Sequence, residues 1–301
     1  MTSSGSVFSK SSRQPAIDPP DRWHGVSLRC TAYSASMNTP MIQVFELHKL
    51  YDTTLAVDGV SFALHPGDIC GLVGPNGAGK TTTLRCLAGL IMPTSGELEV
   101  DGYSVLRDVM QVRRRLAYVP DDPSLFDDLT VGQHLDLIAG LYDVPDWRVK
   151  SDSLLARFGL SGKVNELANS LSRGMRQKLA VCCSYLYDPK VILLDEPLTG
   201  LDPPGIRSLL ESIKERAASG ATVILSSHLL AMIEHVCTHV LVMQQGSVDY
   251  FGTAAGLRDR HPETNTLEEA YFAATNQSMA NEGLAMGALR VSAPLSPVVL
   301  Q

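Results

Sequence analysis

One eight-residue run constrains the fold of this chain more than any other feature. Gly74 to Thr81 reads Gly-Pro-Asn-Gly-Ala-Gly-Lys-Thr, which fits the pattern of a glycine, four residues and then Gly-Lys-Ser/Thr. Glycines let the backbone fold tightly and approach a ligand without a Cβ clash. The N–H groups of the loop then face a phosphate at a helix N-terminus, whose dipole favours anions. The run therefore predicts a phosphate-binding loop between a strand and a helix.

The flanking residues supply the setting that this pattern needs. Ile69 to Val73 is a short apolar run that predicts a buried strand, and Thr82 to Leu90 predicts a helix with no glycine before Gly89. Lys80 can reach the β and γ oxygens of a nucleotide, and the Thr81 hydroxyl can ligate Mg²⁺. The alternative is an ordinary glycine-rich turn, but such a match arises by chance in about one chain in a hundred of this length.

A second motif lies far along the chain, where the apolar run Val191 to Leu194 ends in Asp195 and Glu196. A buried strand that delivers an aspartate to the edge of a sheet is what a Mg²⁺ site beside a phosphate requires. Glu196 is placed to orient or deprotonate an attacking water. Taken alone this motif is weak, because apolar strands often end in acidic residues.

A third motif opens a helix with a hydroxyl residue and a glycine. It consists of Leu171, Ser172, Arg173, Gly174 and Met175. The Ser172 hydroxyl and the nearby N–H groups can form a second anion site at a helix N-terminus. An ordinary N-capped helix explains the same residues equally well.

Along the chain the order is the phosphate loop, the motif at 171–175 and then Asp195-Glu196, followed by Leu201-Asp202 and by His228 after the run 222–227. In this order the motifs resemble the nucleotide-binding subunit of ATP-binding cassette (ABC) transporters. The resemblance covers about residues 41–252. It implies that ATP is bound by Gly74, Pro75, Asn76, Gly77, Ala78, Gly79, Lys80, Thr81 and Thr82, and that Leu171, Ser172, Arg173, Gly174 and Met175 bind the ATP held by a second protomer. It also implies that Thr81 and Asp195 lie near Mg²⁺ and that Glu196 is the catalytic base. His228 would contact the γ-phosphate. Leu201 and Asp202 would link the two protomers.

Three further positions are singled out by the resemblance. Tyr51 stands where the family has an aromatic residue that stacks on adenine, although a core or edge tyrosine is the alternative. Asp121 stands where the family usually has glutamine, and a carboxylate there can ligate Mg²⁺ directly or through water. Arg173, Gly174 and Met175 replace the more common Gly-Gly-Gln, a form similar to the exporter-like branch whose permeases are called ABC-2 type.

Composition restricts the class of protein further. The net charge of −7 argues against a nucleic-acid-binding surface, which needs clustered lysine and arginine. The longest apolar candidate, Leu179 to Tyr187, has nine residues, whereas roughly 20 are needed to cross a bilayer. The six cysteines have neither zinc-ribbon nor redox spacing, and we expect free thiols. His235 and His239 have a helical spacing but cross a predicted helix–strand junction, so we predict no metal site there.

The pattern along the chain predicts three regions. Residues 1–40 are rich in Ser, Pro and Arg and indicate a disordered extension, with the functional start at Met37 or Met41. Residues 41–260 form the ATPase domain, within which residues about 122–188 make a helical subdomain. Residues 261–301 hold a helix from Leu267 to Thr275 and a flexible tail. There are no internal repeats, which favours one ATPase domain over a fused tandem.

Within the ATPase domain, strands are expected at 42–48, 56–64, 69–73, 97–101, 116–119, 221–226, 239–243 and 248–251. Helices are expected at 131–141, 147–158, 175–187, 204–218 and 229–236. The spacing of Val131, Leu135, Ile138 and Leu141 predicts a stripe that packs in the core. The predicted fold class is α/β: a P-loop NTPase with a mixed sheet core, an N-terminal antiparallel β subdomain and a helical subdomain that carries the signature.

The resemblance implies that two copies bind two ATP–Mg²⁺ between them, as a homodimer or as a heterodimer with a second ATPase subunit. The ATPase would power a separate membrane permease, in the direction of export, from the cytoplasmic face of the cell membrane. One alternative is a soluble ABC ATPase acting on DNA or ribosomes, but tandem cassettes, zinc modules and long coiled coils are lacking. The other alternative is a regulatory module that ATP switches without any transport, and the presence of Glu196 and His228 argues against it. Import in place of export also stays open as the direction of transport.

Overall fold

The computed structural model describes residues 39–228, 230–264 and 266–273. The predicted extension before residue 39, including Met37 and Cys30, and the predicted tail after residue 273 lie outside the described residues. The structure can therefore be compared with the sequence over the predicted ATPase domain and the first part of the region that follows it.

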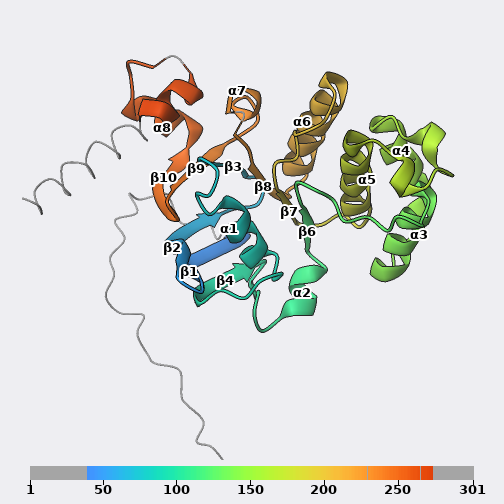
Figure 1. The fold of residues 1–301 in the computed structure, drawn as a ribbon, viewed down its shortest axis with the longest axis horizontal. Coiled ribbons are helices and arrows are strands. Elements are labelled where there is room, and N and C mark those ends of the chain that lie inside the picture. The colour runs from blue at the N-terminus through green and yellow to red at the C-terminus, as the bar shows by residue number, and fades with distance from the viewer. Residues whose placement is uncertain (1–38, 229, 265, 274–301) are drawn as a thin grey trace, which may run out of the picture. The chain divides into compact units, whose positions relative to one another are not determined.

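An antiparallel sheet forms the N-terminal part of the described chain (Figure 1). Its strands are β1 (Ile42–Tyr51), β2 (Thr54–Leu64), β4 (Ser95–Val100) and β5 (Tyr103–Ser104), in the order β2-β1-β4-β5. Inward-facing residues along β1 and β2 alternate with exposed ones, which is the pattern of a sheet with one face on a core and one face in water. The strands predicted at 42–48, 56–64 and 97–101 are confirmed, and β1 continues three residues further, to Tyr51.

The second sheet has six strands in the order β10-β9-β3-β8-β7-β6. They are β3 (Ile69–Val73), β6 (Leu116–Val119), β7 (Val191–Leu194), β8 (Thr222–Ser226), β9 (His239–Gln244) and β10 (Ser247–Thr253). Only β10 runs antiparallel to its neighbour. Because parallel strands end at the same edge of a sheet, the segments that follow β3, β6, β7 and β8 meet there. This is the edge at which three of the predicted motifs begin.

Strand β7 shows how the sheet divides the core. All four of its residues are buried; Val191 and Leu193 pack into the cluster shared with the antiparallel sheet, whereas Ile192 and Leu194 pack into the cluster under the helices. Side chains of a strand alternate between its two faces. A strand covered on both faces must be apolar throughout, which is why this run is so plain in the sequence.

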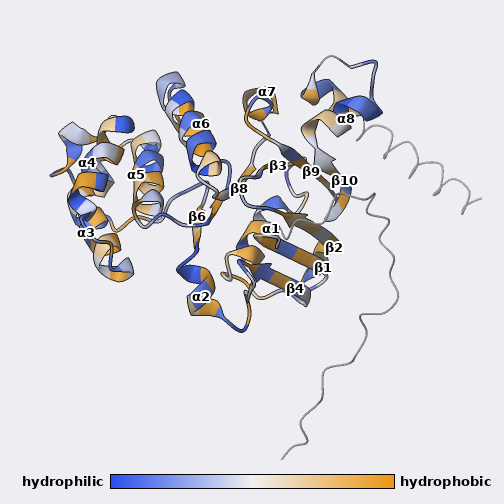
Figure 2. Cartoon of the chain, turned by 180° about the vertical axis from the view of Figure 1, so that it is seen from behind, coloured by the Kyte–Doolittle hydropathy of each residue, from blue (hydrophilic) through white to orange (hydrophobic). Residues whose placement is uncertain are grey.

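The larger helices are α1 (Lys80–Leu87), α3 (Val131–Tyr142), α4 (Trp147–Arg157), α5 (Arg173–Leu186) and α6 (Pro203–Ala218). Helix α3 starts with a capping box in which Thr130 and Gln133 each bond the other's backbone N–H. Figure 1 shows α3, α4 and α5 gathered together, with α6 between them and the rest of the core sheet. Helix α6 carries both hydrophilic and hydrophobic residues (Figure 2), as expected of a helix with one face on the core.

The predicted core stripe of α3 is correct for three residues and wrong for the fourth. Val131 and Leu135 are fully buried, and Ile138 is partly buried against the core, but Leu141 is 67% exposed. At about 100° per residue, Leu141 lies about 80° around the helix from Val131, which puts it at the edge of the stripe. It is therefore a surface residue of the helical part of the chain.

Several short elements differ from the sequence prediction. The helix predicted at 229–236 is shorter, α7 (Leu230–Ile233), and α2 (Val109–Arg113) and α8 (Ala254–Arg260) were not predicted. Helix α8 contains Gly256 and spans only seven residues, so it lacks the sustained period that the sequence analysis requires. Two short 3₁₀ helices lie at Ser161–Lys163 and Ala168–Ser170. Residues 267–273 are helical, in agreement with the predicted last helix as far as the description reaches.

An ion-pair cluster joins the two sheets. Asp101, just after β4, accepts hydrogen bonds from Arg115 Nε at 2.8 Å and Lys190 Nζ at 2.9 Å, which precede β6 and β7. Burial acts to raise the pKa of Asp101, but the bonds from Lys190 and Arg115 outweigh it and hold the pKa below the ordinary value of 3.8. The Asp101 carboxylate thus ties the turn after the small sheet to the core sheet.

Two sequence predictions concern the described residues as a whole. The cysteines within the described part of the chain are Cys70, Cys86, Cys182, Cys183 and Cys237, all of them buried and free. Among the helices in the described ranges, none has the length and apolar character that a membrane crossing requires.

Candidate functional site

The phosphate loop joins β3 to α1, as the sequence predicts, and its backbone admits only glycine at two positions. A Cβ on Gly74 would lie 2.2 Å from the Met243 carbonyl oxygen, and a Cβ on Gly79 would lie 2.5 Å from the Ala56 carbonyl oxygen. Gly79 also has a left-handed φ of 98° at the N-cap of α1. The loop therefore packs closely against the backbone at Met243 and at Ala56. These contacts hold the backbone of the loop in place where helix α1 begins.

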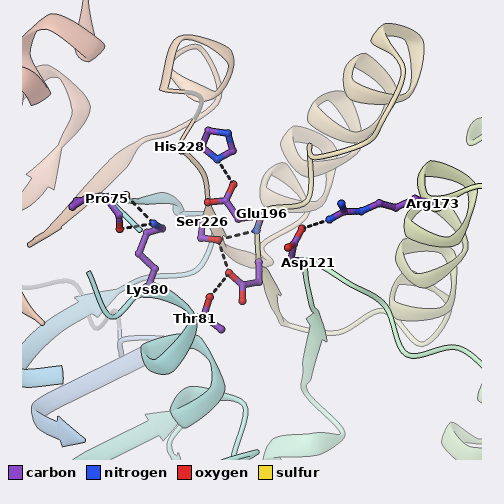
Figure 3. Close-up of polar contacts among 10 residues, drawn as sticks. Pro75, Lys80, Thr81, Asp121, Arg173, Glu196, Ser226 and His228 are labelled. Atoms are coloured by element: carbon purple, nitrogen blue, oxygen red, sulfur yellow. Dashed lines mark hydrogen bonds and ion pairs between the residues drawn. The ribbon is translucent and has the colours of Figure 1, made fainter. Parts of the chain in front are cut away.

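Lys80 is the first residue of α1 and is buried, with 6% of its surface exposed. Its ammonium donates hydrogen bonds to the carbonyl oxygens of Gly74 at 2.7 Å and Pro75 at 3.1 Å (Figure 3). Burial lowers the pKa of Lys80, while the charges of Glu196 and Asp195 act in the opposite direction. The side chain is thus held along the loop by two of the loop's own carbonyl groups.

Asp195 is the residue that β7 delivers to this edge, and it is 2% exposed. Its Oδ1 accepts hydrogen bonds from Thr81 Oγ1 at 3.1 Å and from Ser226 Oγ at 2.7 Å, and its Oδ2 accepts one from the Tyr118 hydroxyl at 3.2 Å. Burial raises the pKa of Tyr118 to about 12, so this hydroxyl keeps its proton and donates. Three donors from three elements fix the Asp195 carboxylate beside the Thr81 hydroxyl, and the Mg²⁺ site expected there stays a prediction.

Glu196 follows in an unusual backbone conformation. Its φ is 46°, which is sparsely populated by non-glycine residues and costs on the order of 1–3 kcal/mol. Its N–H donates to Ser226 Oγ at 2.8 Å, and its Oε2 lies 2.8 Å from Nδ1 of His228. The glutamate is thus held at both its backbone and its carboxylate, and Figure 3 shows it between His228 and Ser226.

Two adjoining cavities lie on this edge of the sheet. One, of about 490 Å³, is lined by Gly74, Pro75, Asn76, Asp121, Arg173, Glu196, Thr199 and His228. The other, of about 380 Å³, is lined by Ala56, Asn76, Gly77, Ala78, Gly79, Lys80, Thr81, Thr82, Asp121 and Glu196. Every predicted residue of the phosphate loop therefore faces one of the two, together with Glu196. A larger cavity of about 580 Å³ near the starts of β7 and β8 contains none of the predicted site residues.

Asp121 and Arg173 face the same cavity from opposite sides. Asp121 follows β6, Arg173 begins α5, and their carboxylate and guanidinium are 2.9 Å apart. The sequence departs from the family pattern at Asp121 and in the signature at Arg173 and Met175, and the structure places Asp121 and Arg173 in contact.

The other signature residues lie apart from the phosphate loop of their own chain. Ser172 caps α5 by accepting a hydrogen bond from Met175 N–H at 3.3 Å, and a Cβ on Gly174 would lie 2.5 Å from the Gly200 carbonyl oxygen. Leu171 is buried and Met175 packs against the core. Within the described residues, none of these four lines either cavity beside the phosphate loop.

The pair Leu201-Asp202 lies between β7 and α6. Asp202 accepts a hydrogen bond from Lys178 Nζ at 2.7 Å, and that bond lowers its pKa. Leu201 is partly buried against the core. This segment is therefore bound to α5, the helix that carries the signature.

Tyr51 ends β1 and is 43% exposed, with the Lys49 ammonium 4.7 Å from the centre of its ring. It does not line the cavities beside the phosphate loop. Its predicted stacking on adenine stays a prediction.

Three residues of the site were missed in the sequence. Ser226 and Tyr118 hold Asp195, and Thr199 lines the larger of the two cavities. Ser226 ends an apolar strand that is parallel to β7, so its place beside Asp195 depends on strand order. A polar residue at the end of an apolar run was the only local signal.

Comparison with known proteins identifies the family. The sequence model described as "ABC transporter" matches residues 57–199. The ABC-type transporter ATP-binding protein EcsA of Bacillus subtilis (strain 168) is 33% identical over 245 residues, which is 80% of this chain and 99% of EcsA. The chain belongs to the ATP-binding subunits of ABC transporters. It is an ABC ATPase, and its two sheets with flanking helices are the P-loop ATPase fold that the sequence predicts.

Further relatives of this ABC ATPase agree. The Nod factor export ATP-binding protein I of Ralstonia nicotianae is 37% identical over 211 residues, 69% of this chain and 66% of that protein. A solved structure titled as an ATP-binding subunit of an ABC transporter is 33% identical with a TM-score of 0.75, covering 78% of this chain and 99% of that one. The structure of cbiO1 from Clostridium perfringens, described as part of the transporter complex cbiONQ, is 27% identical with a TM-score of 0.62, covering 74% and 96%. These relatives agree with the assignment of the chain to the ATP-binding subunits of ABC transporters.

Proposed function

We propose that this ABC ATPase works as a pair of subunits that close around two ATP–Mg²⁺ and drive a separate membrane permease. The observation that carries the proposal is the arrangement at the edge of the core sheet. A phosphate loop with a buried lysine faces Asp195 and Glu196, which are held by Ser226 and His228. Cationic and N–H groups for phosphate thus lie opposite carboxylates for a metal and a water.

The residues present fit both ATP and Mg²⁺. A Cβ on Gly77 would meet nothing within 4 Å, so the middle of the loop is open to a phosphate. The Thr81 hydroxyl and the Asp195 carboxylate, 3.1 Å apart, are the hard oxygen donors that Mg²⁺ prefers. Thr81 would bind the ion and Asp195 would lie beside it, with Asp121 as a further candidate; bound there, Mg²⁺ would neutralise charge on the phosphates.

Glu196 is the group best placed to take a proton from water. Its side chain is 18% exposed and borders both cavities, and its Oε2 lies 2.8 Å from Nδ1 of His228. A carboxylate in this position orients the water and accepts its proton as it attacks the terminal phosphate. The contact with His228 fixes the direction in which the carboxylate points.

The position of the signature supports a second chain in each site. Ser172 and Gly174 do not line the phosphate cavities of their own chain, so we expect them to contact the ATP of a second chain. A site built from two chains couples nucleotide binding to closure of the pair. Whether the second chain is another copy of this one or a related ATPase subunit is left to the experiment below.

The permease would meet the surface formed by the segment after β6 and helix α3. Phe126 and Leu141 are 62% and 67% exposed, and a cavity of about 270 Å³ between α1, α3 and α5 is lined in part by Leu90, Ile138 and Tyr142. Exposed large apolar side chains are typical of a protein interface. The name of the Nod factor export relative favours export as the direction, and such a permease would hold this subunit at the cytoplasmic face of the membrane.

The experiment compares the purified chain and its Glu196→Gln variant by size-exclusion mass with ATP–Mg²⁺ or ADP–Mg²⁺. The variant should bind ATP without hydrolysing it and form a dimer that appears with ATP and not with ADP. The matched control is Lys80→Ala combined with Glu196→Gln, which should stay monomeric because it no longer binds ATP. A Glu196→Gln chain that binds ATP and stays monomeric would refute the two-copy site and point to a different ATPase partner.

A further inference from the structure

Tyr118 contacts a carboxylate of the site from the edge of the core sheet. It lies on β6, the last of the six strands, and its hydroxyl donates a hydrogen bond to Asp195 Oδ2 at 3.2 Å. The other oxygen of this carboxylate, Oδ1, accepts hydrogen bonds from Thr81 and Ser226. The two oxygens of Asp195 are thus held by different partners, and Oδ2 is held by Tyr118.

The ring of Tyr118 is packed, which fixes the place of its hydroxyl. The residue is half-buried and packs against the core cluster that the two sheets share. One part of the ring also borders the cavity of about 270 Å³ between α1, α3 and α5. Because a tyrosine side chain has two torsions, packing of the ring leaves the hydroxyl little freedom to move. The bond to Asp195 is therefore directed by the fold of β6.

Arg85 approaches the same hydroxyl from helix α1. Thr81 and Arg85 are four residues apart on this helix, so their side chains lie on the same face of it. Contact with the Tyr118 hydroxyl is the main reason that the pKa of Arg85 lies above its ordinary value, and the charge of Asp195 adds to it. A hydroxyl both donates and accepts. A guanidinium beside its oxygen therefore favours the orientation in which the Tyr118 proton points to Asp195.

We propose that Tyr118 is a positioning residue of the metal site: it orients the Asp195 carboxylate for the ion, and Arg85 acts on that carboxylate through Tyr118. The inference rests on the proposed ATP–Mg²⁺ site. Groups that orient a metal-site side chain commonly change metal affinity about tenfold or more. In the described part of the chain, neither Tyr118 nor Arg85 lines the cavities beside the phosphate loop. Loss of the hydroxyl should therefore change nucleotide binding through the metal and not through direct contact.

The first test measures ADP binding by calorimetry, in excess Mg²⁺ and in EDTA. ADP is used because it is not hydrolysed and, under the proposed function, does not bring two chains together. Tyr118→Phe keeps the ring and removes the hydroxyl. It should weaken ADP binding about tenfold in Mg²⁺ and leave ADP binding in EDTA unchanged.

Tyr187→Phe is the matched control. The Tyr187 hydroxyl also bonds β6, where it donates to the Leu116 carbonyl oxygen at 3.2 Å, and Tyr187 borders the same cavity as Tyr118. The chemical change and the strand are the same, but Asp195 is not involved, so neither ADP affinity should change. A Tyr118→Phe chain that binds ADP in Mg²⁺ as tightly as wild type would overturn the proposal. Equal losses in Mg²⁺ and in EDTA would also overturn it, because they indicate a general defect of the site.

A second account of the hydroxyl is that it only shields the charge of Asp195. Without the shield, the bare carboxylate repels phosphate more strongly and attracts a cation more strongly. Tyr118→Phe would then weaken ADP binding in EDTA and preserve or tighten it in Mg²⁺. This pattern is the reverse of the one expected for a positioning residue, and it would overturn the proposal.

The double variant tests whether Arg85 acts through Tyr118. Arg85→Gln should weaken ADP binding in Mg²⁺ about threefold, the loss expected for one hydrogen bond. In the Tyr118→Phe background the same change should have no further effect, because the hydroxyl that Arg85 orients is gone. The measurements are made at about 0.15 M salt, which screens the exposed guanidinium from the nucleotide. An equal loss in both backgrounds would show that Arg85 acts by its charge alone and would overturn its part in the proposal.

Hydrolysis supplies a second readout, the Mg²⁺ concentration that gives half of the maximal rate at saturating ATP. Tyr118→Phe should raise this concentration about tenfold and approach the wild-type rate in high Mg²⁺, because excess ion offsets weaker binding. A rate that stays low at every Mg²⁺ concentration would contradict the proposal. A wild-type chain whose ADP binding does not respond to Mg²⁺ would instead contradict the proposed metal site, so the two failures are distinguishable.

Discussion

Ser226 holds the two carboxylates of the site in place, and its removal has a cost that follows from its bonds. The Ser226 hydroxyl is fully buried, donates to Asp195 Oδ1 at 2.7 Å and accepts from Glu196 N–H at 2.8 Å. Ser226→Ala removes a hydrogen bond to a charged group and leaves the Glu196 N–H without its partner. The two effects overlap, and together they should lower the free energy of unfolding by about 2–4 kcal/mol.

The assay is urea denaturation of the nucleotide-free chain, with ATP hydrolysis as a second readout. Thr222→Val at the other end of β8 is the matched control, because it removes one neutral hydrogen bond, from Thr222 Oγ1 to the His65 carbonyl oxygen at 2.8 Å. It should cost about 1 kcal/mol and leave hydrolysis unchanged. Ser226→Ala should lower both stability and hydrolysis, since Glu196 then loses the bond that stabilises its left-handed backbone. Equal losses of stability for the two variants, with hydrolysis intact, would refute the reasoning.

Two other predictions concern packing and pH. Gly174→Ala should destabilise the chain by about 1–3 kcal/mol in the same denaturation assay, because its Cβ would lie 2.5 Å from the Gly200 carbonyl oxygen. Gly162→Ala is the control and should not destabilise the chain, because its Cβ would meet nothing within 4 Å. The pKa of Asp101 is lowered in the folded chain, so its contribution to stability is present above the ordinary pKa and lost as the pH falls through the folded value. The stability difference between wild type and Asp101→Asn should therefore be constant from about pH 7 to 5 and shrink below about pH 4, and a difference that grows on acidification would contradict the ion-pair account.

The parts of the fold that the sequence predicted well are those whose signal is local. The glycines of the phosphate loop are required by close contacts with Ala56 and Met243, and the pattern records that requirement directly. Strands β3, β7 and β8 are buried on both faces, so their apolar runs stand out. Once these strands lie side by side and parallel, the residues that follow them must meet, which is why Asp195 and Glu196 lie near Lys80.

The parts that could not be predicted depend on which segments pack together. The sequence analysis assigned no role to Ser226 or Tyr118, and both became visible as site residues only when strand order put them beside Asp195. The contact between Asp121 and Arg173 joins residues 52 positions apart, on elements whose relative placement no local pattern records. The exposed Leu141 shows the same limit, since a helical period gives the direction of a side chain but not what packs opposite it. Helix α8 was missed for a different reason, because its seven residues are too few to show a period.

The most direct test of the central claim is Mg²⁺-dependent ATP hydrolysis by the purified chain, wild type against Glu196→Gln. The account assigns Glu196 as the group that takes the proton from the attacking water, a contribution worth on the order of a hundredfold or more in rate. We predict that wild type hydrolyses ATP and that Glu196→Gln binds ATP as tightly but turns it over at least about a hundredfold more slowly. A Glu196→Gln variant that hydrolyses ATP at the wild-type rate would contradict the account.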